Sequence, residues 1–237
     1  MQAVSPQTSI DNRILAALPV EERERLLPNL ESVHLHKGRI IYEAGDAANF
    51  AYFVCQGMIS LLSTTEDGEI IEVAMVGSEG VTGIPIILRV NKIPYRAMVQ
   101  LPVDALRIKA EALKAEFDRG GRFQHLLLCY THALFTQVAQ SAVCNRFHTV
   151  EERLCRWLLV SRDRVGSDTF ELTQEFIAHM LGMPRSGVSG TAKALQKAGL
   201  ISYSRGRITI LDRRGLEKSS CECYRIVKDA VENCTPS

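Results

Sequence analysis

The residues best suited to chemistry in this sequence are cations gathered in one stretch near the carboxyl end. They are Arg185, Lys193, Lys197, Arg205 and Arg207. Between Glu175 and Asp212 the chain has no acidic residue to balance them. A local excess of positive charge of this kind favours binding of a polyanion such as DNA.

The residues around these cations have the pattern of two helices followed by a β-hairpin. Thr173 can cap a first helix, and Gly182 supplies a tight turn before a second helix over about residues 184–199. One side of the second helix is basic and built of small residues, which suits a helix that enters the major groove. The hairpin, with residues 204–207 at its tip, would form a wing that lies beside the phosphates of the DNA backbone.

We therefore predict a DNA-binding surface on the second helix, the start of the helix before it and the wing. Arg185 would read guanine, whereas Arg205 and Arg207 would contact phosphates. The predicted DNA-contacting residues are Thr173, Gln174, Arg185, Ser186, Ser189, Lys193, Arg205 and Arg207. A two-helix packing corner with a solvated basic face is the alternative, and the wing and the charge asymmetry argue against it.

Upstream elements must position this surface. Residues 10–30 predict one or two short helices interrupted by Pro19 and Pro28. From Val33 to about Lys109 the chain consists of short β-type runs separated by turn residues, which predicts an all-β domain. Within it, residues 67–68 (Asp-Gly) predict a two-residue type I′ hairpin turn.

A helical period follows from Gly121 and predicts one long helix. Its apolar positions alternate in spacings of four and three, which is typical of a helix that packs lengthwise on another helix. We predict that this helix forms a homodimer, with an interface at Leu127, Tyr130, Leu134 and Ser141. Packing of the helix on its own β domain is the alternative.

The predicted fold class is α+β. We expect an antiparallel, jelly-roll-like β-roll sensor domain with short helices over residues 10–118 and a dimerisation helix over 119–147. A winged helix-turn-helix over 148–217 and a tail helix over 218–237 complete the predicted order. Length and composition suit two globular cores, with 46% hydrophobic and 23% charged residues among 237.

These segments together resemble the Crp/Fnr family of bacterial transcription regulators. The matching motifs are RIIYEAGD, AYFVCQGMISLL, FHTVEERLCRWLL, LTQEFIAHMLGMPRSGV and AGLISYSRGRITIL. The resemblance implies a cyclic-nucleotide-binding-like β-roll and a homodimer on an inverted-repeat DNA site, with RNA polymerase as a further partner. Ser186 and Gly190 stand where the family often has Glu and Arg, so the target need not be the commonest one.

The resemblance also implies how nucleotide-binding members hold cyclic AMP, with a glutamate on the ribose and an Arg-Ser or Arg-Thr pair on the phosphate. Here Ala97 follows Arg96, and Val81 or Thr82 stands at the carboxylate position. Losing both partners would leave polar groups of the nucleotide unpaired, so we expect no cyclic AMP. We therefore expect an unidentified effector to bind near Arg96, Thr82 and Gly83. A salt bridge is the alternative role of Arg96.

The cysteines predict no cofactor. None precedes Cys55, which argues against the amino-terminal iron–sulfur cluster of the oxygen-sensing branch. Cys221 and Cys223 with the distant Cys234 form a weak metal pattern, so we assign no metal site and interpret His148 as a packing or surface residue. Seven cysteines without an export signal favour reduced thiols. A metal- or redox-responsive regulator that uses cysteines is an alternative.

Other classes of protein fit less well. No apolar run is long enough for a membrane span and no export signal is present, so we expect a cytoplasmic protein. Glu151 and Glu152 would point apart on a helix, with no nucleophile nearby, so we expect no enzyme. A β-roll interaction protein that does not bind DNA is a further alternative, but it leaves the basic winged helix unexplained.

Overall fold

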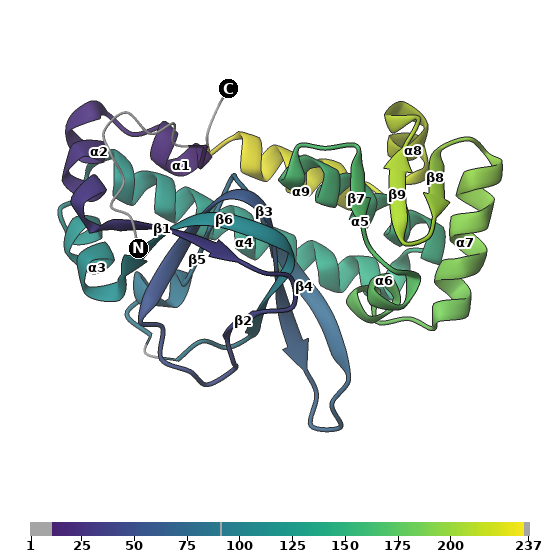
Figure 1. The fold of residues 1–237 in the computed structure, drawn as a ribbon, viewed down its shortest axis with the longest axis horizontal. Coiled ribbons are helices and arrows are strands. Elements are labelled where there is room, and N and C mark those ends of the chain that lie inside the picture. Colours follow the sequence, from purple (N-terminus) through teal and green to yellow (C-terminus); the bar gives the residue numbers. More distant parts are fainter. Residues whose placement is uncertain (1–10, 91, 235–237) are drawn as a thin grey trace.

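Figure 1 shows the computed structural model of the chain, which describes residues 11–90 and 92–234. A curved antiparallel sheet is followed by a long helix, and a helical unit with a small second sheet forms one end of the molecule. The predicted fold class, a β-roll with a carboxy-terminal winged helix-turn-helix, is confirmed. Within the described ranges, no helix is both long and apolar enough to cross a membrane.

Short helices precede the sheet, as predicted. They are α1 (Arg13–Ala16), α2 (Val20–Leu26) and the 3-10 turn η1 (Leu27–Asn29). Pro19 stands immediately before α2, where its missing N–H costs no hydrogen bond, and Pro28 lies inside η1. Residue 10 of the predicted sensor domain and residues 235–237 of the predicted tail lie outside the described residues.

The main sheet has the antiparallel order β1-β6-β3-β4, with β2 beside β6 and β5 beside β3. Its strands are β1 (Leu30–Leu35), β2 (Ile40–Tyr42), β3 (Phe50–Thr64), β4 (Ile70–Val76), β5 (Val81–Thr82) and β6 (Arg96–Lys109). Register shifts between Val54 and Ile59 interrupt the β3–β6 pairing, and such bulges bend a sheet. Gly57 lies within them at a φ of +89°, and a Cβ there would stand 1.9 Å from the Pro102 carbonyl oxygen.

The hairpin between β3 and β4 differs from the prediction. Residues 65–69 form the connection, in which the Gly68 N–H bonds to the Thr65 carbonyl at 3.0 Å. Gly68 has a φ of +85°, whereas Asp67 is not among the residues with positive φ. The predicted two-residue type I′ turn is therefore wrong, because that turn needs positive φ at both central positions.

The first half of the long helix closes the β-roll. The 3-10 turn η2 (Ile84–Ile86) precedes β6, and α3 (Ala110–Asp118) leads from β6 to α4 (Gly121–Phe147). Phe123 and Leu127 of α4 are fully buried, in the same core as Phe53 of β3. Tyr130 packs so tightly against Gly80 that a Cβ on this glycine would lie 2.3 Å from the tyrosine oxygen.

This packing corrects the predicted dimer interface. Leu127, Tyr130 and Ser141 are buried within one chain, and Leu134 packs on the core of the β-roll. Periodicity identified the buried side of the helix, but that side faces the chain's own sheet. The assignment of Leu127, Tyr130 and Ser141 to a dimer seam is therefore wrong, because the chain itself buries them, whereas Leu134 is half-buried against the β-roll core.

Two buried polar residues of α4 have a clear role in the structure. The Ser141 hydroxyl donates a 3.0 Å hydrogen bond to the Val73 carbonyl of β4. The Gln137 amide, in the orientation that satisfies both of its groups, pairs with the backbone N–H and carbonyl of Met75 at 2.8 and 3.3 Å. Since β4 is an edge strand, these bonds cap backbone groups that the sheet leaves unpaired.

The carboxy-terminal unit begins after α4. Its elements are α5 (Val150–Val165), β7 (Thr169–Glu171), α6 (Gln174–Leu181), α7 (Arg185–Lys197), β8 (Ile201–Ser204), β9 (Arg207–Ile210) and α8 (Arg213–Ser219). Thr149 and Glu152 form a capping box at the start of α5, and Gly166 ends this helix in the left-handed conformation. The three strands have the order β7-β9-β8.

The last helix of the described residues returns along α4 (Figure 1). This helix is α9 (Cys223–Glu232), so the predicted tail boundary at residue 218 falls inside α8 instead of between helices. A disulfide joins Cys129 of α4 to Cys234 just after α9. The expectation of reduced thiols is therefore wrong for this pair, since α9 brings two residues 105 positions apart in sequence into contact.

Candidate nucleic-acid interface

Helices α6 and α7 form the two-helix corner that the sequence predicts. The Thr173 hydroxyl caps α6 by accepting a hydrogen bond from the Phe176 N–H at 3.2 Å. Gly182 adopts a φ of +57° and allows the chain to turn towards α7. The apolar side of α7 is buried at Val188, Ala192 and Leu195, so the opposite side of this helix must face outwards.

The outward side of α7 carries the predicted base-reading residues. Arg185, Ser186 and Lys193 are exposed, and the Ser189 hydroxyl donates to the side-chain oxygen of Gln174 at the start of α6. A Cβ on Gly190 would meet nothing within 4 Å. Packing within the chain therefore does not require this glycine, although it costs about 1 kcal/mol relative to Ala inside a helix. A partner that approaches the backbone closely would explain it.

The wing is a tight hairpin between β8 and β9. Arg205 and Gly206 have φ angles of +49° and +78°, as a two-residue type I′ turn requires. The exposed Arg205 side chain therefore stands at the tip. Arg207 instead forms a 3.0 Å ion pair with Glu171 of β7, and both side chains are exposed, so the pair is weak and open to competition from a phosphate.

Most of the predicted DNA-contacting residues line two hollows that share Gln174 and Tyr203. The first hollow is lined by Thr173, Gln174, Arg185, Tyr203, Arg205 and Gly206. The second is lined by Gln174, Ala192, Lys193, Gln196, Lys197 and Tyr203. Tyr203 is not among the residues predicted from the sequence. Its hydroxyl donates a 2.8 Å hydrogen bond to the Leu172 carbonyl, which fixes the wing beside α6.

The predicted effector residues lie beside two consecutive residues at the end of β2, Tyr42 and Glu43. Arg96 forms a 2.7 Å ion pair with Glu43. Thr82 is buried, and its hydroxyl oxygen lies 3.5 Å from the Tyr42 hydroxyl. Gly83 has a φ of +86°, and a Cβ there would lie 3.2 Å from that same hydroxyl. Tyr42 therefore fills space beside Thr82 and Gly83, while Glu43 neutralises the cation.

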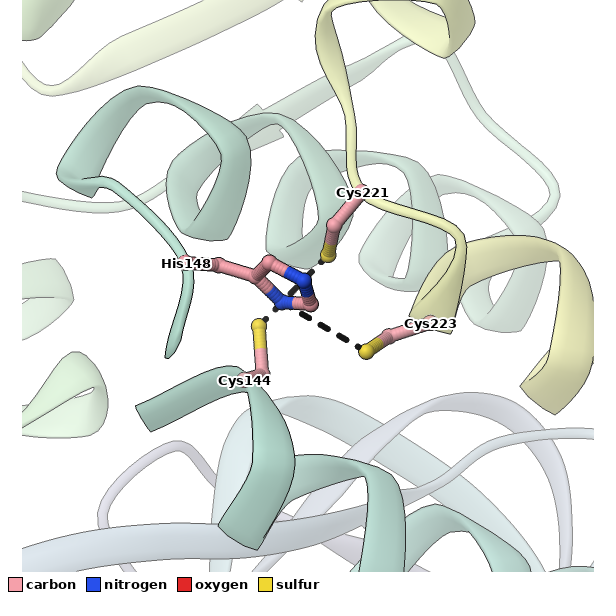
Figure 2. Close-up of side chains that lie close together, drawn as sticks. All are labelled: Cys144, His148, Cys221 and Cys223. Carbon is pink, nitrogen blue, oxygen red and sulfur yellow. Dashed lines mark hydrogen bonds between the residues drawn. The ribbon is translucent and has the colours of Figure 1, made fainter. Parts of the chain in front are cut away.

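A second group of reactive side chains lies at the end of α4 (Figure 2). Cys144 belongs to the last turn of α4 and His148 caps it, while Cys221 and Cys223 lie at the start of α9. The Cys144 and Cys221 sulfurs are 3.6 Å apart, and His148 Nδ1 lies 3.6 Å from the Cys223 sulfur. The hydrogen bond with Cys221 lowers the pKa of Cys144 and therefore favours its thiolate.

Cys234, which the sequence pattern combines with Cys221 and Cys223, lies elsewhere in the structure and is bonded to Cys129. Cys144 and His148 are members of the group that the sequence pattern does not include. Their spacing of four residues on one helix is the signal that could have joined them. Cys221 stands 77 positions from Cys144, and no local pattern reports such a contact.

Comparisons with known proteins agree with this architecture. Residues 32–119 match the family model of the cyclic nucleotide-binding domain, and residues 152–219 match that of the Crp-like helix-turn-helix domain. The global nitrogen regulator of Nostoc sp. is 24% identical over 184 residues, which cover 73% of this chain and 82% of that protein. The global nitrogen regulator of Synechococcus elongatus is 23% identical over 193 residues, covering 77% and 86%.

Solved structures share the fold. FixK2 from Bradyrhizobium japonicum superposes with a TM-score of 0.69 at 17% identity, covering 81% of this chain and 98% of that one. A transcriptional regulator of the CRP family from Thermus thermophilus has a TM-score of 0.67 at 20% identity, covering 79% and 96%. The two domain models follow one another along most of the sequence in the order that the fold shows. This chain therefore belongs to the Crp/Fnr family and is a DNA-binding transcription regulator.

Proposed function

We propose that the protein acts as a homodimer that reads an inverted-repeat DNA site, with one α7 helix of each subunit in the major groove. The observation that carries this proposal is the pair of hollows between α6, α7 and the wing, which share Gln174 and Tyr203 and bring together the exposed Arg185, Lys193 and Arg205. A forked arginine at the start of a recognition helix can meet guanine O6 and N7. Arg205 at the wing tip would contact phosphates and add affinity without sequence preference.

The remaining predicted contacts divide by position. Ser186, Ser189 and Lys193 follow Arg185 along α7 and would meet base edges or neighbouring phosphates. Thr173 and Gln174 begin α6, whose amino-terminal end would lie at the DNA backbone. Arg207 would exchange its partner Glu171 for a phosphate.

The dimer is proposed to form through the exposed side of α4. Leu128 and Phe135 stand seven residues apart and are 48% and 71% exposed, and Val138 is a third exposed apolar residue. Ala142, a further seven residues after Phe135, is exposed and small. Repeats of seven with intermediate apolar positions suit a two-stranded helix pair. This stripe lies one position away from the inward-facing one that contains Leu127 and Leu134.

We propose that cyclic AMP is not the effector. Arg96 is paired with Glu43, and the following residue is Ala97, which offers no hydroxyl to a phosphate. A different anion would have to displace Glu43 to bind Arg96. Membership of the family supports a cytoplasmic location and contact with RNA polymerase, and it supports transcription control in place of catalysis.

Selection of binding sites from a random duplex pool by the full-length protein tests the proposed function. The expected result is an inverted repeat whose half-site centres are about 10 base pairs apart, because two symmetric α7 helices must enter successive major grooves. An enriched site without symmetry would contradict binding as a symmetric homodimer. Absence of any enrichment would contradict sequence-specific binding.

A further inference from the structure

The side chains of Cys144, His148, Cys221 and Cys223 have the arrangement of a closed metal site. One ligand atom from each residue can be chosen so that all four lie within 4.8 Å of one another. The three cysteines are buried, and only the histidine side chain reaches the surface, with 12% exposure. Three thiols and an imidazole without a metal would be an unusual concentration of reactive groups in a packed interior.

Two of the distances within the group are those expected for ligands of a single tetrahedral ion. Zinc bonds of about 2.3 Å to sulfur and about 2.0 Å to nitrogen place two sulfurs about 3.8 Å apart and a sulfur and a nitrogen about 3.5 Å apart. The Cys144–Cys221 sulfur separation is 3.6 Å, and Cys223 sulfur to His148 Nδ1 is 3.6 Å. In a cubane iron–sulfur cluster each ligand binds a separate iron, so the ligand atoms would stand farther apart.

The second ring nitrogen of His148 supplies an independent indication of a metal. While Nδ1 faces the thiols, Nε2 lies 3.4 Å from a carboxylate oxygen of Glu222. Metal-bound histidines commonly donate their other N–H to a carboxylate, which fixes the ring and makes it a better ligand. Glu222 lies between the two cysteines of the C-x-C pair, so one short segment provides two ligands and the group that orients a third.

Positive charge beside the site suits thiolate ligands. Three thiolates and a neutral imidazole around a divalent ion would leave one negative charge. Arg156 of α5 is 6% exposed and lies close enough to interact electrostatically with Cys144 and Cys223. Arg153, one turn earlier on α5, interacts with Cys144 in the same way. Both arginines come from the DNA-binding unit.

We propose that Cys144, His148, Cys221 and Cys223 bind one Zn²⁺ ion per chain, which clamps the start of α9 to the junction of α4 and α5. The soft, four-ligand donor set leaves no open position and is that of a structural zinc site. This junction connects the long helix to the helix-turn-helix, so the ion would fix the orientation of α7. That consequence rests on the proposed DNA-binding function, whereas the metal site itself does not.

Metal content of the full-length protein tests the site directly. Protein expressed in zinc-supplemented medium and purified without oxygen or chelators should contain one equivalent of zinc by elemental analysis. Replacing zinc by Co²⁺ should give thiolate-to-cobalt charge-transfer bands and the visible absorption of tetrahedral cobalt. A substoichiometric trace of zinc with no cobalt spectrum would overturn the proposal. Stoichiometric iron and sulfide, or a Cys144–Cys221 disulfide in the fresh protein, would also overturn it.

Matched variants locate the ligands. Cys223→Ser and His148→Ala should lose the ion, whereas Cys55→Ser, at a half-buried cysteine of the β-roll, should retain it. Glu222→Gln should keep the four ligands but weaken metal affinity by roughly 10- to 100-fold. Retention of stoichiometric zinc by the folded Cys223→Ser protein would exclude Cys223 as a ligand. Far-UV circular dichroism of each variant identifies any that has simply failed to fold.

DNA binding provides the separate test of the clamp. Removal of the ion with a chelator should weaken binding to the selected site, and added zinc should restore it. Unchanged affinity in the metal-free protein would contradict the clamp while leaving the zinc site intact. Failure of the zinc-loaded protein to bind any DNA would instead contradict the proposed function, so the failures are distinguishable.

Discussion

The indole N–H of Trp157 donates a 2.7 Å hydrogen bond to the carboxylate of Glu72 and thereby joins the DNA-binding unit to the β-roll. Trp157 lies on α5 and Glu72 on β4, and both are buried. Arg164 of α5 and Glu79, which follows β4, form a second buried contact at 3.1 Å. The face of the sheet that receives α5 also supplies Met58, Leu62 and Met75 to the shared core. Rearrangement in the β-roll therefore has a direct route to the helix that precedes α6 and α7.

Glu72 should make the stability of the protein depend on pH. Burial raises the pKa of Glu72 from 4.5 to about 7, so the folded state holds this proton more tightly than the unfolded chain. The corresponding stability is full below about pH 4.5 and is lost as pH rises to about 7. Glu72→Gln removes this titration and should gain stability relative to wild type between pH 5 and 8, by at most about 3 kcal/mol.

Urea unfolding at several pH values measures this difference. Glu69→Gln, at an exposed position of the same hairpin, is the matched control and should follow the wild type. An identical pH dependence in wild type and Glu72→Gln would mean that the carboxylate is already ionised in the folded protein at low pH, against this prediction.

The dimer should depend on the exposed stripe of α4. Phe135→Glu places a charge where two helices would meet and should give monomers at low micromolar concentration, because a buried unpaired charge is strongly unfavourable. Val20→Glu is the control, since Val20 of α2 is also exposed and apolar but lies outside the stripe. Size-exclusion chromatography with light scattering reports the mass. A dimeric Phe135→Glu protein would place the interface elsewhere.

Cyclic AMP should leave the melting temperature unchanged. A ligand that binds only the folded state adds about 2.7 kcal/mol when its concentration is 100 times its dissociation constant. At millimolar nucleotide, a shift of several degrees in a thermal melt would show tight binding and contradict the prediction. Cyclic GMP in a parallel melt separates a specific response from a general effect of nucleotides.

Gly190 should separate stability from DNA binding. A Cβ at this position meets no other atom within 4 Å, so Gly190→Ala should stabilise α7 by up to about 1 kcal/mol. Gly190→Leu should also fold, but its side chain would project towards the bases and weaken binding to the selected duplex. Chemical unfolding and fluorescence anisotropy measure the two effects. Wild-type DNA affinity in Gly190→Leu would show that the duplex does not approach this part of α7.

Local signals were sufficient to predict the DNA-binding corner from sequence. Thr173, Gly182 and Gly199 mark the ends of helices through capping and positive φ, which depend on neighbours a few residues away. The structure confirms both helices and the hairpin after them. The role of Tyr203 could not be predicted, because it depends on a hydrogen bond to Leu172, 31 positions away, which no local sequence pattern indicates.

The dimer seam and the cysteine cluster could not be predicted in the same way, because they depend on packing between residues far apart in the sequence. The period of α4 identifies a buried stripe, but it contains no information on whether a sheet or a second helix covers that stripe. Ser141 hinted at the answer, because a hydroxyl suits the edge of a sheet better than an apolar seam, and it does bond to Val73 of β4. The Cys144–Cys221 proximity was hidden for a similar reason, since it depends on α9 returning along α4.

The division of roles between Arg185 and Arg205 is the central claim about DNA recognition. Binding of wild type, Arg185→Ala and Arg205→Ala to the selected site and to an unrelated duplex, each over a range of salt concentrations, tests it most directly. Arg185→Ala should cost about 1 to 3 kcal/mol on the selected site and little on the unrelated one. Arg205→Ala should weaken both alike and lower the slope of log affinity against log salt by about one per lost phosphate contact in each subunit. Full sequence preference in Arg185→Ala, together with its loss in Arg205→Ala, would contradict α7 as the recognition helix.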